Sequence, residues 1–112
     1  MTCSTNFLRI ILPIALFLNG CTPVIFSPVD SDLQRAKKYW NDITLEHLKS
    51  GYKLYVSKCG GCHTLYPPQQ FPKEKWIKLM PDMAKEAKLD SVRIGLIARY
   101  ILTMQTVNPK ER

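Results

Sequence analysis

The sequence has few of the side chains that bind metals. Its 112 residues include only four cysteines and two histidines. A zinc ribbon needs a second pair of soft ligands at a spacing similar to that of Cys59 and Cys62. The remaining cysteines, Cys3 and Cys21, lie in a predicted export signal, and His47 alone does not complete a four-ligand site. The small number of cysteines and histidines therefore argues against a structural zinc site.

Long apolar runs are also missing. Residues 7–18 are apolar apart from Arg9 and Pro13, and they fall short of the roughly 20 residues that a membrane helix needs. They resemble the apolar region of a secretory signal. The following Leu18-Asn19-Gly20-Cys21 resembles the lipobox of bacterial lipoproteins. We therefore expect a signal peptide over residues 1–20 and a lipid on Cys21, with an uncleaved anchor or an ordinary signal as alternatives.

This interpretation predicts where the protein resides. A lipid on Cys21 would hold an exported chain at the periplasmic side of a membrane. The residue after the acylated cysteine is Thr22 and not an aspartate. By the sorting pattern of lipoproteins, this weakly favours the outer membrane as the location. Residues 21–43, with two prolines near their start, are expected to form a tether and a short N-terminal helix.

One short motif carries the chemistry, and it reads Cys59-Gly60-Gly61-Cys62-His63. The pattern C-x-x-C-H attaches a c-type haem, because both thiols add to the porphyrin vinyl groups and the imidazole becomes the proximal iron ligand. A thioredoxin-like redox pair would follow a strand, whereas the residues before Cys59 have a helical pattern. A disulfide between Cys59 and Cys62 would leave His63 unexplained. The sequence therefore predicts one covalent haem c.

Helical patterns surround the motif and predict an all-α protein. Thr44 is a candidate cap for a helix that leads into Cys59, and Asp90 is a candidate cap for the last helix. A third helix begins at Lys73, and we expect Pro81 to kink or break it near Met80. The predicted segments are a short helix over about 30–40, a domain over 44–106, and a frayed C-terminal tail over 107–112.

The motif and its preceding helix resemble a known family. The pattern Gly51-x-x-Leu54-Tyr55-x-x-x-Cys59-x-x-Cys62-His63 is similar to the N-terminal helix and haem site of class I c-type cytochromes. In that family a glycine lets the C-terminal helix cross closely, and residues 97–102 with Tyr100 would be the matching segment. The resemblance covers about residues 44–104. It implies a class I fold of three to four short helices around one haem.

The same resemblance suggests the remaining site residues. Small bacterial members have a tryptophan followed seven residues later by the methionine that is the sixth iron ligand, which implies Trp76 and Met83 here. Met80 is the alternative ligand, and His47 is a weaker one. A proline carbonyl in the family orients the proximal histidine, so Pro67 or Pro68 would do so, with Pro68 taken as the site residue. A simple rigid turn is the other interpretation of these prolines.

The predicted function is single-electron transfer by a monohaem cytochrome c with His/Met ligation, outside the cytoplasm. A haem enzyme or ligand sensor with an open sixth position, or a subunit of a larger redox complex, is the alternative. The net charge of +7 suits an acidic redox partner, because an exported chain rarely meets nucleic acid. The lysines that could rim the haem edge are Lys58, Lys73, Lys75, Lys78, Lys85 and Lys88, although each also suits a solvated helix face.

Overall fold

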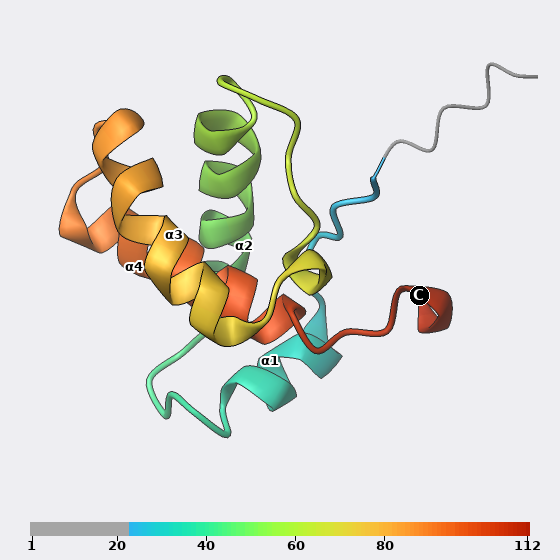
Figure 1. Ribbon diagram of the computed structural model, residues 1–112. Coiled ribbons are helices and arrows are strands. Elements are labelled where there is room, and N and C mark those ends of the chain that lie inside the picture. The colour runs from blue at the N-terminus through green and yellow to red at the C-terminus, as the bar shows by residue number, and fades with distance from the viewer. Residues whose placement is uncertain (1–22) are drawn as a thin grey trace, which may run out of the picture.

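The fold is a small assembly of helices. The computed structural model describes residues 23–112, so the predicted signal peptide and Cys21 lie outside the described residues. The α-helices are α1 (Asp30–Ala36), α2 (Leu45–Leu54), α3 (Lys73–Glu86) and α4 (Ser91–Met104), and residues 23–112 contain no strand. Figure 1 shows α4 running behind α2 and α3, with α1 below them. The prediction of an all-α architecture is confirmed for this part of the chain.

Two of the predicted caps start their helices. Thr44 Oγ1 accepts a hydrogen bond from the backbone N–H of His47 at 3.1 Å. Asp90 Oδ1 accepts one from the backbone N–H of Arg93 at 2.8 Å. Each bond satisfies an N–H group that has no partner inside its own helix, so α2 and α4 begin where the sequence predicted.

The crossing of α2 and α4 depends on Gly51. A Cβ atom placed on Gly51 would overlap the backbone carbonyl oxygen of Leu96 and lie 2.9 Å from Cβ of Tyr100. The two helix backbones therefore approach more closely than any residue with a side chain would permit. The close approach expected for Gly51, with Tyr100 at the crossing, is confirmed.

The helix that leads to the haem motif changes its winding before it ends. The α-helical part stops at Leu54, and a π-helical turn, η2, covers Tyr55–Cys59. Such wide turns have hydrogen bonds from residue i to i+5 and often occur at functional sites. The periodicity predicted one helix leading into Cys59. The structure has that helix, but its last turn is π-helical rather than α-helical.

Helix α3 is not broken at Pro81, where a kink or a break was expected. The helix runs without a break from Lys73 to Glu86 with Pro81 inside it. The face formed by Trp76, Met80 and Ala84 is buried on both sides of the proline. Burial of this apolar face offsets the hydrogen bond that proline removes, which costs about 3 kcal/mol in a helix interior.

A single aromatic and aliphatic core holds α2, α3 and α4 together. Tyr55, Trp76 and Tyr100 are at most 2% exposed. The rings of Tyr55 and Trp76 lie 6.3 Å apart, and those of Tyr55 and Tyr100 lie 5.9 Å apart. The other buried members of this core are Cys59, Met80, Ile97, Ile101, Met104 and Val107. Cys59 of the haem motif is thus anchored directly in the core.

The C-terminal residues are attached to the domain, in contrast to the predicted frayed tail. A short 3₁₀ turn, η4, covers Pro109–Glu111. The guanidinium of Arg112 then donates to the backbone oxygen of Ser27 at 3.0 Å and pairs with the carboxylate of Asp32. Asp32 is 1% exposed and also accepts a hydrogen bond from the backbone N–H of Val29 at 2.8 Å. A buried carboxylate needs such partners, and Arg112 supplies one of them.

None of the helices within residues 23–112 combines the length and the apolar character needed to cross a membrane.

Candidate functional site

A cavity lies between the haem motif and the end of α3. The C-terminal ends of η2 and α3 lie at the upper end of the fold in Figure 1. The cavity has a volume of about 270 Å³. Its lining comes from the haem motif with the residue before it and from the last two turns of α3 with the residue after it. The residues are Lys58, Cys59, Cys62, His63, Asp82, Met83, Glu86 and Ala87. The fold therefore brings the two thiols and the imidazole of the motif to one space together with the thioether of Met83.

The two cysteines are free thiols with different surroundings. Cys59 is buried and Cys62 is exposed, and they form no disulfide with each other. Burial raises the pKa of the Cys59 thiol, and the nearby Cys62 adds to this effect. No group of three or more His, Cys, Asp or Glu side chains among the described residues is placed to hold a metal ion.

His63 is exposed and is held by few contacts. Its Nδ1 atom lies 2.7 Å from the backbone oxygen of Thr64. Its ring centroid lies 5.2 Å from that of Tyr66. The orientation of the imidazole therefore depends mostly on the backbone at either side of it.

The two candidate methionine ligands occupy different places on α3. Met83 is half-buried and lines the cavity. Met80 is 7% exposed, belongs to the core, and lines a separate groove between α3 and α4. His47, the third candidate, caps the N-terminal end of α2 through its bond with Thr44, at the end opposite Cys59. This arrangement favours Met83, whose role as a ligand stays a prediction.

Trp76 and Pro68 form a contact that the sequence did not predict. Trp76 is fully buried, and its Nε1–H donates to the backbone oxygen of Pro68 at 2.8 Å. Trp76 is not among the residues that line the cavity. The expected bond between His63 and a proline carbonyl is not formed in this structure, since His63 contacts Thr64 instead. A carbonyl oxygen has two lone pairs, so Pro68 can still accept a second donor, and its predicted role stays untested.

Tyr55 is the residue of this region that sequence reasoning missed. Its hydroxyl donates to the backbone oxygen of Tyr66 at 2.5 Å. Burial raises the pKa of Tyr55 well above its usual range, because a phenolate would be poorly solvated there. The hydroxyl thus remains a donor. The sequence pattern includes Tyr55 only as a residue of the helix before the motif, and no local signal indicates its partner eleven residues later.

Comparison with protein families identifies the chain. The family model for dihaem cytochrome c matches residues 55–111, just over half of the 112 residues. The chain belongs to the dihaem cytochrome c family. The match begins at Tyr55 and includes the complete C-x-x-C-H motif, α3 and α4. Comparisons with curated proteins and with solved structures gave no match.

Membership of the dihaem cytochrome c family supports a covalently bound haem c as the cofactor and haem-based electron transfer as the function. The side chains around the cavity fit such a group by their donor chemistry, because they include two thiols, an imidazole and a thioether. The family description names two haems, whereas this sequence contains one C-x-x-C-H motif.

Proposed function

We propose that this protein is an electron-transfer cytochrome that binds one haem c per chain with His/Met axial ligation. The observation that supports this proposal is the shared cavity, which collects Cys59, Cys62, His63 and Met83 from two separate segments. Cys59, Cys62 and His63 lie close together because they are near one another in the sequence. Only the packing of α3 against the core explains the presence of Met83.

Each of these residues has a distinct role in the proposal. Cys59 and Cys62 attach the porphyrin, and the buried position of Cys59 fixes that attachment to the core. His63 is the proximal ligand, and Met83 is the sixth. The haem supplies a one-electron iron couple, and a thioether ligand raises its reduction potential and leaves no open coordination position. The class I fold remains part of this proposal.

The single motif bears on the number of haems. One C-x-x-C-H sequence provides one covalent attachment site, so we propose a monohaem chain within a family described as dihaem.

The proposal also includes a location in the cell and a redox partner. A lipid on Cys21 would attach the exported chain to the periplasmic side of a membrane, with a weak preference for the outer membrane. An acidic redox protein would dock on the lysines of α3 and its ends, which are all exposed. The net charge of +7 supports such a partner, although Asp82 and Glu86 also line the cavity. Nucleic acid is not expected as a partner.

The test is an optical and mass measurement of the mature protein made in a host with the haem ligation machinery. We expect the polypeptide mass to increase by one haem, a weak far-red sulfur-to-iron band in the oxidised spectrum, and slow carbon monoxide binding in the reduced protein. A colourless protein at the bare polypeptide mass would refute the proposal. Rapid carbon monoxide binding would instead favour a haem enzyme or ligand sensor, for which Asp82 and Glu86 offer polar groups beside Met83.

A further inference from the structure

The hydroxyl of Tyr55 closes a loop of chain around the haem motif. Tyr55 is the first residue of η2, the turn that ends at Cys59. Its hydroxyl reaches across to the backbone oxygen of Tyr66, three residues after His63. All five residues of the haem motif therefore lie, in sequence, between the two residues joined by this hydrogen bond.

We propose that Tyr55 is a positioning residue for His63, acting through its hydrogen bond to the Tyr66 carbonyl. This inference rests on the proposed function, because it assumes that His63 binds the haem iron. It adds a residue that the motif itself does not contain.

The surroundings of Tyr55 make its hydroxyl a fixed point. The side chain is 2% exposed and packs between the rings of Trp76 and Tyr100. A hydroxyl on a ring held in this way cannot follow a moving acceptor, so the Tyr66 carbonyl has to stay in place to keep the bond. Trp76 holds the carbonyl of Pro68 in the same manner. Two buried aromatic residues thus hold two backbone positions of the loop that follows His63.

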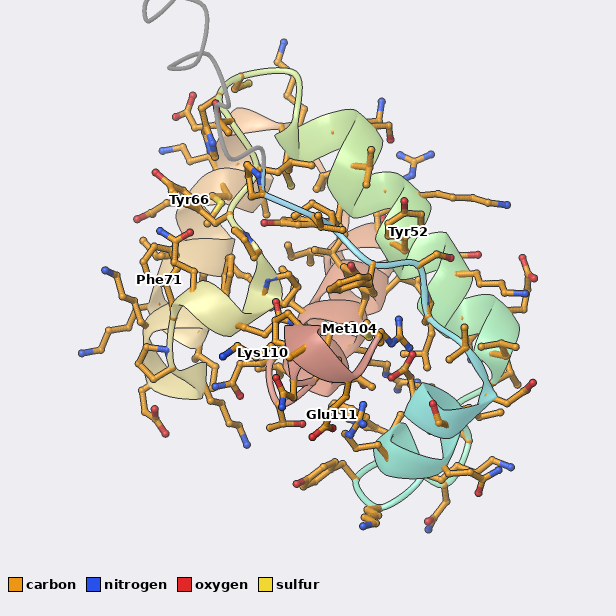
Figure 2. All side chains as sticks on the ribbon, turned by 90° about the vertical axis from the view of Figure 1, so that its right-hand side faces the viewer. Tyr52, Tyr66, Phe71, Met104, Lys110 and Glu111 are labelled. Atoms are coloured by element: carbon orange, nitrogen blue, oxygen red, sulfur yellow. The ribbon has the colours of Figure 1, made fainter. Side chains whose placement is uncertain are left out.

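His63 has little else to orient it. It is exposed, its one hydrogen-bond contact within residues 23–112 is with the adjacent Thr64, and its ring packs beside Tyr66. Figure 2 shows Tyr66 and Phe71 close together on this loop, and their ring centroids lie 5.1 Å apart. With Cys62 attached to the haem, His63 lies between a covalent anchor and the Tyr66 position. Supporting contacts of this kind set the orientation of a ligating histidine and the properties of its metal.

Tyr100 provides a matched control. It is also a fully buried tyrosine of the same core, and its hydroxyl also donates to a backbone oxygen, that of Phe26, at 2.8 Å. Phe26 belongs to the segment before α1 and does not line the haem cavity. Removing either hydroxyl should reduce stability by a similar amount, but only the hydroxyl of Tyr55 is connected to His63.

The experiment compares haem-loaded full-length protein carrying Tyr55→Phe with protein carrying Tyr100→Phe. We expect Tyr55→Phe to shift the paramagnetically shifted proton resonances of the His63 ring and the reduction midpoint. Tyr100→Phe should lower the thermal midpoint comparably and leave both haem signals at wild-type values. Replacing Tyr55 with 4-aminophenylalanine, which restores a donor, should move the signals back toward wild type.

Equal haem signals in the two phenylalanine variants would overturn the inference, as would unchanged signals in Tyr55→Phe. If Tyr55→Phe does not fold, the comparison is repeated with Gly95→Ala added to both variants, because a Cβ at Gly95 has no neighbour within 4 Å and alanine favours the helix. These outcomes are distinct from failure of the proposed function, which would appear as wild-type protein without covalent haem.

Discussion

Gly51 of α2 lies directly against the backbone carbonyl of Leu96 in α4, with no room for a methyl group between them. This contact sets the distance between the helix that carries the haem motif and the helix that closes the fold. Gly95, one residue before Leu96, has the opposite environment, since a Cβ placed there would meet nothing within 4 Å. The two glycines therefore form a matched pair.

Gly51→Ala should strongly destabilise the protein, because the added methyl group forces α2 and α4 apart. We expect a loss of about 3 kcal/mol or more in the free energy of unfolding, at the upper end of typical overpacking effects. Gly95→Ala should instead stabilise it by about 0.5 to 1 kcal/mol through helix propensity. Denaturant unfolding followed by circular dichroism measures both values. Equal effects would show that the helix crossing does not depend on Gly51.

Substitution of the two α3 methionines should separate ligation from packing. Met83→Ala is expected to abolish the sulfur-to-iron band and to permit rapid carbon monoxide binding, because Met83 is the thioether at the cavity. Met80→Ala should retain that band and lose about 2 to 5 kcal/mol of stability, because Met80 is buried in the core. Visible spectra and carbon monoxide kinetics provide the measurement. The reverse pattern would make Met80 the ligand.

Arg112→Ala should weaken the attachment of the C-terminal residues. The substitution leaves the buried Asp32 carboxylate with Arg35 as its remaining ion-pair partner, at 2.8 Å, and removes the bond to Ser27. We expect a loss of about 2 kcal/mol, since hydrogen bonds to charged groups contribute that order of stability. Lys110→Ala is the control, because Lys110 is exposed and, among the residues that the structure describes, it forms a hydrogen bond only through its backbone N–H. Similar thermal midpoints for both variants would contradict the expectation.

Pro81→Ala tests how α3 accommodates its internal proline. Because the helix is continuous through this position, alanine should restore one backbone donor and stabilise the protein by about 1 to 3 kcal/mol. The same unfolding measurement applies. A destabilised variant would mean that the shape imposed by proline is needed to bury Met80 and Ala84 together.

Electron exchange with an acidic partner should depend on salt. The exposed lysines of α3 would steer the partner by long-range attraction, which salt screens within roughly 10 Å at 0.1 M. Stopped-flow rates should fall as ionic strength rises, and Lys78→Ala should reduce the slope. Rates that do not change with salt would contradict electrostatic steering by these lysines. They would not bear on the proposed haem ligands.

Local chemistry made much of the site predictable. The C-x-x-C-H spacing is determined by covalent chemistry, and the caps at Thr44 and Asp90 are determined by unpaired N–H groups within a few residues. Gly51 was informative because a glycine inside a helix is costly. Each of these signals lies within one short segment of the sequence.

The remaining features depend on residues far apart in the chain. Tyr55 bonds a carbonyl eleven residues away, and Arg112 pairs with Asp32 eighty residues away. Neither pairing has a local pattern. The break considered at Pro81 does not occur for a related reason. The sequence shows the local cost of a proline inside a helix, but it does not show that Met80 and Ala84 are buried on either side of it.

The wide turn between Tyr55 and Cys59 has a consequence for changes in chain length. The wide turn joins residues i and i+5, one residue more than the i to i+4 bonds of an α-helix. A deletion would therefore let the turn become α-helical and keep Cys59 near the core, whereas an insertion would move Cys59 away from it. The exposed side chains of Val56 and Ser57 should tolerate exchange for other residues. Between Tyr55 and Cys59, a one-residue deletion should be tolerated better than a one-residue insertion.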